Sequence, residues 1–133
     1  MRYMLDTNIL IYAIKRSPEK VFRRLMKTDP KDVCISSISY TELMYGVEKS
    51  SQVERNRLAL SLLLSNIEIL DYDSMAANEY GAIRAWLEKN GTPIGPMDML
   101  IAAHAKSRGF TLVTNNAKEF ERIKGLKIQN WAE

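Results

Sequence analysis

Residues 1–12 read MRYMLDTNILIY, and this stretch places a carboxylic acid and two small polar residues between two apolar runs. The pattern predicts a short buried strand over 2–6 and a helix from about residue 8. An aspartate between a strand and a helix is often a simple cap, whose carboxylate accepts a backbone hydrogen bond. In a sheet of parallel strands, the same position is where ligands bind. The rest of the chain has to distinguish these two interpretations.

Strand patterns and helical patterns alternate along the whole chain. Further strands are predicted at 32–36, 67–70, 111–114 and 127–130, and helices at 8–15, 18–28, 39–49, 53–64, 74–90, 97–108 and 117–122. Strands that are continuously apolar and separated by helices favour a parallel sheet that is covered on both faces. No linker, repeat or low-complexity segment interrupts the pattern, so we expect a single α/β domain over residues 1–133.

The composition excludes several classes of protein. Hydrophobic residues make up 46% of the 133 residues and charged residues 26%, which is typical of a globular domain;. No apolar stretch approaches the roughly 20 residues needed to span a bilayer, and Asp6 interrupts any signal-peptide pattern, so we expect a cytoplasmic protein without a membrane. One cysteine, Cys34, and one histidine, His104, argue against a disulfide or a structural zinc site;. A net charge of +3 is compatible with a polyanionic partner;.

Polar residues gather after the predicted strands, at one edge of the sheet. The acidic candidates and the polar residues beside them are Asp6, Glu42, Asp98 and Glu119, with Thr7, Asn8, Thr114 and Asn116. Each acid also has a structural interpretation. The first could cap a helix, Glu42 could form a capping box with Ser39, Asp98 could interact with a helix dipole, and Glu119 could face solvent.

Taken together, these acids are better explained by a cation. Capping predicts polar residues at helix starts but does not favour acids over serine or threonine. Several carboxylates at one edge would repel one another unless a cation lay between them. Oxygen ligands without histidine or cysteine select Mg²⁺ or Mn²⁺. Such an ion activates water and holds a phosphate oxygen, which is the chemistry of phosphodiester hydrolysis. Thr7 and Asn8 are candidates to bind the second oxygen of Asp6 or a metal-bound water.

Four stretches match a known family in order: MLDTNILIY, CISSISYTELMYGVEKS, GTPIGPMDMLIAAHAKSRG and LVTNNAKEFERIKGLKIQNW. The sequence resembles the PIN-domain ribonucleases, and among them the VapC-type toxins of bacterial type II toxin–antitoxin modules. The resemblance implies a PIN-like three-layer α/β fold, with a parallel five-stranded sheet flanked by helices. It implies that Asp6, Glu42 and Asp98 are the core metal-binding acids. Many PIN domains have aspartate where this chain has Asn116, so Glu119 is expected to supply the fourth catalytic charge.

The resemblance also implies an activity and partners. The expected function is a Mg²⁺-dependent endoribonuclease toxin, with Mn²⁺ as a possible substitute, that inhibits translation. It would cut a transfer RNA in the anticodon stem-loop by in-line hydrolysis, leaving a 5′-phosphate and a 3′-hydroxyl. The expected partners are a VapB-type antitoxin and a second copy of the chain, in a homodimer or a hetero-oligomer. Phosphate contacts are expected from Lys15, Arg16, Lys49, Arg55 and Arg84, and an apolar partner groove from Tyr12, Phe22, Leu43 and Tyr45.

Two other classes of protein remain as alternatives. Haloacid-dehalogenase-like phosphatases also place an aspartate at the end of the first strand, but they need a second one where this chain has Asn8. A catalytically weak metal- and nucleic-acid-binding module would use the same acids without turnover, and Asn116 keeps that interpretation open. His104, six residues after Asp98, lies on a different face of its helix and is expected to be structural.

Overall fold

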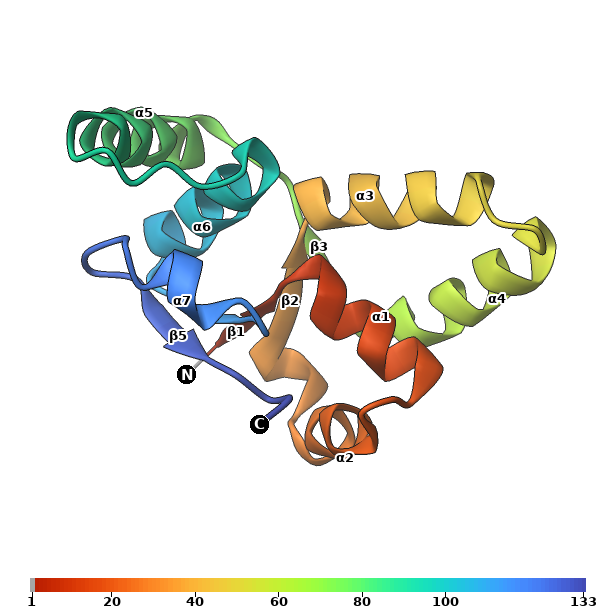
Figure 1. Ribbon diagram of the computed structural model, residues 1–133. Helices are drawn as coiled ribbons and strands as arrows, with labels where there is room; N and C mark the ends of the chain where they lie inside the picture. The colour runs from red at the N-terminus through yellow and green to blue at the C-terminus, as the bar shows by residue number, and fades with distance from the viewer. Residues whose placement is uncertain (1) are drawn as a thin grey trace.

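The computed structural model describes residues 2–133, and its centre is a sheet of five parallel strands (Figure 1). The spatial order is β3-β2-β1-β4-β5, so the N-terminal strand is central. The strands are β1 (Tyr3–Leu5), β2 (Val33–Ser36), β3 (Glu68–Leu70), β4 (Thr111–Val113) and β5 (Lys127–Gln129). Every pairing is parallel, and the register aligns Leu5 with Val113 and Ser36 with Leu70. The predicted parallel five-stranded sheet is therefore confirmed.

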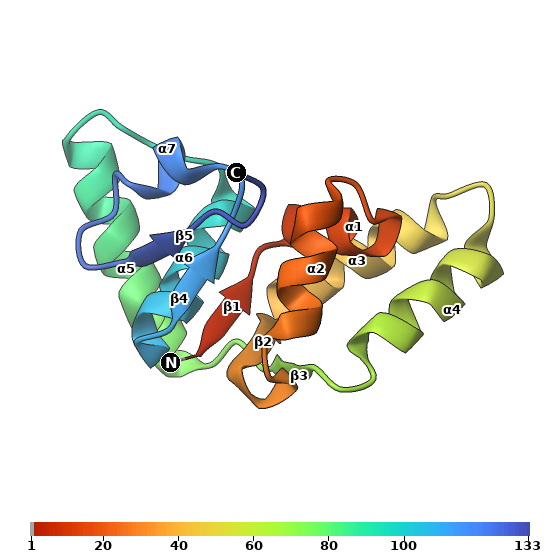
Figure 2. The same ribbon diagram turned by 90° about the horizontal axis from the view of Figure 1, so that it is seen from below.

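Helices cover both faces of this sheet and make the three layers. They are α1 (Thr7–Lys15), α2 (Glu19–Lys27), the 3₁₀ turn η1 (Pro30–Asp32), α3 (Ser37–Glu48), α4 (Val53–Leu64), α5 (Ser74–Lys89), α6 (Pro96–Arg108) and α7 (Ala117–Phe120). Successive strand residues point to opposite faces. Accordingly, Met4 packs in a cluster with residues of α5 and α6, whereas Leu5 packs with residues of α1 to α4. Figure 2 shows these two groups of helices on opposite sides of the strands.

The order of the strands reverses at β1, where the chain crosses from one half of the sheet to the other. Side chains that follow β1 and its two neighbours, β2 and β4, therefore lie at the same carboxyl edge. This is the place where open parallel sheets bind ligands. The α3–α4 hairpin extends away from the sheet opposite α1 (Figure 1).

One element boundary matters for the site. The pattern predicted a helix from residue 39, but α3 begins at Ser37 because Ser36, not Ser39, accepts the hydrogen bond of the N-cap, from the Ile38 backbone N–H at 3.1 Å. The Oγ of Ser39 is buried without a hydrogen-bond partner among the described residues. The alternative interpretation of Glu42, as the partner of Ser39 in a capping box, is therefore wrong. Glu42 lies in the second turn of α3, where its carboxylate is free for another role.

Candidate active site

Asp6 follows β1 directly and is fixed from both sides. Its backbone N–H donates to the Val113 carbonyl at 2.9 Å, which continues the pairing of β1 with β4. One carboxylate oxygen caps α1 by accepting from the Asn8 N–H at 3.2 Å. The other accepts from the Thr114 hydroxyl at 2.6 Å. Asp6 is only 5% exposed, and this burial raises its pKa, although the Thr114 hydrogen bond opposes the shift. Capping and a place at the sheet edge thus coexist in one side chain.

Glu42 reaches this edge from α3. Its Oε1 accepts a hydrogen bond of 2.6 Å from the hydroxyl of Thr7, in the first turn of α1. The negative charge of Glu42 contributes to the raised pKa of Asp6, which places the two carboxylates within electrostatic range of each other;. The Thr7 hydroxyl therefore positions Glu42. The second oxygen of Asp6, one of the two partners expected for Thr7, is bound by Thr114 instead. The side chain of Asn8 is exposed, and only its backbone N–H contacts Asp6.

Asp98 lies in the first turn of α6, where Pro96 begins the helix after Gly95. A Cβ added to Gly95 would lie 3.6 Å from Asp98 Oδ2, so this carboxylate lies close to the start of its own helix. The pKa of Asp98 is raised to about 6, first by burial and then by the negative charges of Asp6, Glu119 and Glu42. All the predicted acids therefore act on one carboxyl group.

The segment after β4 brings the remaining predicted residues to the edge. The Thr114 hydroxyl, fully buried, accepts from the Asn116 backbone N–H at 3.0 Å while it donates to Asp6. The Asn116 amide in turn donates to Glu119 Oε2 at 2.9 Å, from the N-terminal side of α7. Thr114 and Asn116 thus orient acidic side chains. Glu119 is brought into the group of acids by the turn that begins α7.

The chemistry of this cluster fits a divalent cation. None of the four acids forms an ion pair with a lysine or arginine among residues 2–133, and Asp6 and Asp98 have raised pKa values. Uncompensated carboxylate oxygens favour a hard ion such as Mg²⁺ or Mn²⁺. Within the same residues, no three His, Cys, Asp or Glu side chains are already close enough to hold one ion.

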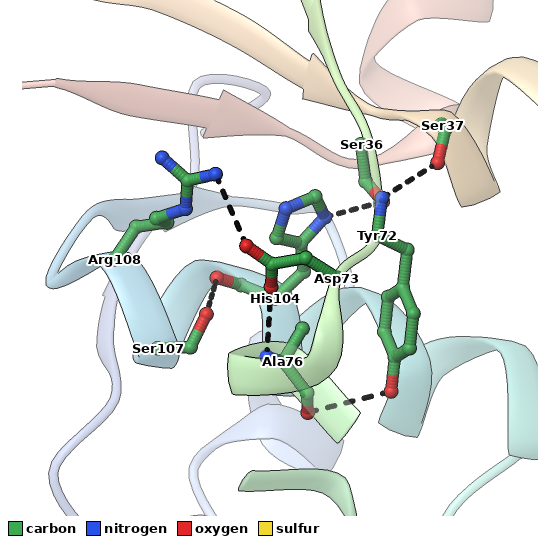
Figure 3. A network of polar contacts seen from close by, with 8 residues as sticks. All are labelled: Ser36, Ser37, Tyr72, Asp73, Ala76, His104, Ser107 and Arg108. Carbon is green, nitrogen blue, oxygen red and sulfur yellow. Dashed lines mark hydrogen bonds and ion pairs between the residues drawn. The ribbon is translucent and has the colours of Figure 1, made fainter. Parts of the chain in front are cut away.

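A second polar network ties the elements of the site together, and the sequence did not predict it (Figure 3). The ring of His104, fully buried on α6, lies with Nδ1 2.8 Å from the Oγ of Ser36, the residue that caps α3. Burial lowers the pKa of His104 and so favours the neutral form of the ring. Because α3 carries Glu42 and α6 carries Asp98, this contact joins the supports of two candidate catalytic residues. The structural interpretation of His104 agrees with this position.

Two other findings concern predicted residues. Tyr12, expected in a partner groove, accepts a 2.8 Å hydrogen bond from the Asn115 amide beside the cluster. Cys34 is buried in β2, and burial raises its pKa to about 11, which makes the thiol unreactive;. Among residues 2–133, no helix is both long and apolar enough to cross a bilayer.

Comparison with known proteins identifies the family. The family model described as "PIN domain" matches residues 3–126. The tRNA(fMet)-specific endonuclease VapC of Shigella flexneri is 48% identical over 132 residues, covering 99% of both chains. Two solved structures superpose with a TM-score of 0.92: DNA-bound VapBC of Salmonella typhimurium, 49% identical and covering 98% of both chains, and VapBC2 of Rickettsia felis bound to promoter DNA, 45% identical and covering 98% of this chain and 99% of that one. The chain therefore belongs to the PIN-domain family and, within it, to the VapC group.

Proposed function

We propose that this protein is a metal-dependent endoribonuclease toxin that cuts transfer RNA in the cytoplasm and so inhibits translation. One observation carries the proposal: the negative charges of Asp6, Glu42 and Glu119 all raise the pKa of Asp98. No basic side chain among residues 2–133 forms an ion pair with any of these acids. Ribonucleases of the PIN family generally depend on a divalent metal. The net charge of +3 suits an RNA substrate;.

Each residue has a defined part in this proposal. Asp6, Asp98 and Glu42 hold a divalent ion, which we propose is Mg²⁺, with Mn²⁺ as a substitute. When bound, that ion supplies an activated water and charge stabilisation at the scissile phosphate. Thr7 fixes the rotamer of Glu42. The hydrogen bond from Thr114 favours the charged form of the Asp6 carboxylate and so opposes the effect of burial on its pKa;.

Glu119 is proposed as the fourth catalytic acid, held by Asn116 and not by a basic residue. In this role Glu119 would accept a proton from the attacking water as a general base. Water as the nucleophile leaves a 5′-phosphate and a 3′-hydroxyl. The relatives named for tRNA(fMet) suggest the initiator transfer RNA as the substrate, and we propose that the cut lies in its anticodon stem-loop.

The experiment compares acids of the cluster with a neighbouring acid outside it. Purified protein with Mg²⁺ should cut initiator transfer RNA, and Asp98→Asn and Glu119→Gln should each lose at least about tenfold in kcat/KM. Glu121→Gln is the matched control. Glu121 lies two residues after Glu119, its side chain is exposed, and its charge does not contribute to the pKa of Asp98. RNA binding without turnover by the unaltered protein would instead support the catalytically weak binding module.

We also propose a VapB-type antitoxin as partner, because the similar structures from Salmonella typhimurium and Rickettsia felis are VapBC complexes. A groove of about 420 Å³ between α1, α2 and α4 offers an apolar surface for it. Of the four residues expected in a partner groove, Phe22 lines this one, and Tyr12, Leu43 and Tyr45 do not. Met26 and Leu62, 57% and 67% exposed, also line it. Leu62→Glu should let the toxin cleave RNA in the presence of the antitoxin, without changing cleavage by the toxin alone. Unchanged inhibition by the antitoxin would exclude this groove.

The domain and assembly complete the proposal. A single PIN domain over residues 1–133 is supported by two apolar clusters that share the one sheet; Met1 lies outside the described residues. The protein is proposed to act as a homodimer or in a hetero-oligomer with the antitoxin. Sedimentation of the protein with and without antitoxin tests this: a single monomeric species in both samples would contradict it.

A further inference from the structure

A second pocket, of about 410 Å³, opens directly beside Glu42 between α1, α3 and α4. We call it the Glu42 pocket. Figure 1 shows α1 facing the α3–α4 hairpin, from which the walls come. Its apolar surface is formed by Ile11, Ile14, Leu43, Val47 and Leu60. Since Glu42 lines the pocket and also accepts the hydrogen bond from Thr7, the pocket is continuous with the acidic cluster.

Besides Glu42, the polar side chains of the Glu42 pocket are two lysines, one asparagine and Ser50, whose hydroxyl already donates to the Val47 carbonyl at 2.6 Å. Lys15 and Lys49 line it, and neither forms an ion pair within residues 2–133. The Asn56 side chain, exposed on α4, also lines it, and in the same part of the chain its amide has no hydrogen-bond partner. The Lys49 ammonium lies 5.0 Å from the centre of the Tyr45 ring, a contact that leaves its charge without an anionic partner. An apolar slot with an unpaired amide and two ammonium groups outside any ion pair matches a nucleobase with flanking phosphates.

Gly46 keeps one wall of this pocket open. It lies inside α3, where glycine is less favourable than almost any other residue;. A Cβ added to Gly46 would meet no atom within 4 Å, so local packing does not require glycine here. The missing side chain leaves pocket volume that a larger residue would fill.

We propose that the Glu42 pocket binds one unstacked base of the substrate RNA, next to the phosphate that is cut. Lys15 and Lys49 contact the flanking phosphates, and the Asn56 amide bonds to the edge of the base. This inference rests on the proposed ribonuclease function and specifies how that site selects its RNA. Charge and continuity with the acidic cluster favour RNA over an apolar peptide, because an unpaired base presents an apolar face, a polar edge and an attached anion.

The test fills the pocket without disturbing the fold. Gly46→Leu is compared with Gly81→Leu, the matched control, because Gly81 is an exposed glycine inside α5 whose added Cβ would also meet no atom within 4 Å. Both changes favour helix. On a synthetic anticodon stem-loop without antitoxin, Gly46→Leu should lower kcat/KM about tenfold or more, the effect of losing one well-fitted group in a pocket. Gly81→Leu should match the unaltered protein.

A second measurement separates base binding from general damage. Stem-loops that carry a single abasic nucleotide at successive positions beside the cut are assayed with the unaltered protein. At one position, the loss in kcat/KM should equal the loss caused by Gly46→Leu on the intact stem-loop. The two losses should not multiply when combined, because both remove the same interaction. The proposal would be overturned if the Gly46→Leu variant cleaved as well as the Gly81→Leu variant. It would also be overturned if the losses in kcat/KM from Gly46→Leu and from the abasic nucleotide multiplied at every position.

The same comparison is made by binding, so that it does not depend on turnover. In the Asp98→Asn background, Gly46→Leu should weaken binding of the intact stem-loop by about the same factor and leave binding of the critical abasic stem-loop unchanged. If the unaltered protein cut no RNA but this pattern held, the base pocket would stand and the proposed catalytic function would fall. Equal weakening for the intact and abasic stem-loops would overturn the base pocket while cleavage by the unaltered protein stood.

Discussion

Replacing Asp98 by asparagine should make the metal-free protein more stable while it abolishes RNA cleavage. In a chelator, Asp98 carries a charge that the fold disfavours: its pKa lies at about 6 instead of 3.8, because of burial and three neighbouring carboxylates. A raised carboxyl pKa means that the folded protein binds the proton more tightly than the unfolded chain does. Its contribution to stability is therefore present at low pH and is lost as the pH rises from about 4 through about 6;.

The magnitude follows from that pKa. Each pKa unit corresponds to about 1.4 kcal/mol, and solvent screening at a half-buried carboxylate reduces the total cost of ionisation to about 1–2 kcal/mol. The start of α6 offsets about 0.3–1 kcal/mol, because the helix dipole favours a negative charge in the first turn. Asp98→Asn should thus raise the free energy of unfolding by about 1 kcal/mol above pH 7. At pH 4, where Asp98 is protonated, the two proteins should be nearly equal.

Urea unfolding in EDTA at pH 4 and pH 7.5 measures this difference, with Glu121→Gln as the control. Adding Mg²⁺ at pH 7.5 should stabilise the unaltered protein more than Asp98→Asn, because the ion removes the repulsion that the substitution has already reduced. A variant that is less stable than the unaltered protein at both pH values would refute the reasoning. Equal stabilisation of both proteins by Mg²⁺ would exclude Asp98 as a ligand.

Three further predictions follow from single contacts. Thr114→Val removes the 2.6 Å hydrogen bond to Asp6 and should move the acidic limb of the pH profile of kcat/KM up by roughly one to two pH units, with little change at pH 9;. Ser36→Ala removes the cap of α3 and leaves the buried His104 Nδ1 without a partner, so urea unfolding should show a loss of about 2–4 kcal/mol;. Cys34 should not react with iodoacetamide at pH 8 until the protein is unfolded, because its pKa is about 11;.

The fold was predictable because its signals are local. Continuous apolar strands such as Val33–Ser36 and helices bounded by residues such as Pro96 and Gly109 can be read from neighbouring positions alone. The start of α3 was misplaced because Ser36, Ser37 and Ser39 are all good caps, and only tertiary structure selects between them;. Here the contact with His104, 68 residues further along the chain, holds Ser36 at the N-cap.

The acids of the candidate site were predictable, but their partners were not. Asp6, Glu42 and Asp98 each lie at a recognisable position relative to a strand or helix. The contacts that orient them join distant segments: Thr114 donates to Asp6 across 108 residues, and Thr7 donates to Glu42 across 35. Proximity in sequence suggested Thr7 as the partner of Asp6. In the folded chain, the Thr7 hydroxyl donates to Glu42 on α3. The parallel pairing of β1 with β4 brings Thr114 to Asp6 instead.

The central claim is that the acidic cluster uses a divalent ion to hydrolyse RNA, and mapping the cut ends tests it most directly. Initiator transfer RNA is incubated with the purified protein in Mg²⁺ or in EDTA, and with Asp6→Asn in Mg²⁺. We expect a cut in the anticodon loop in Mg²⁺ alone, with a 5′-phosphate and a 3′-hydroxyl, and no cut in the other two samples. Cleavage that persists in EDTA or in Asp6→Asn, or that leaves a 2′,3′-cyclic phosphate, would contradict the account.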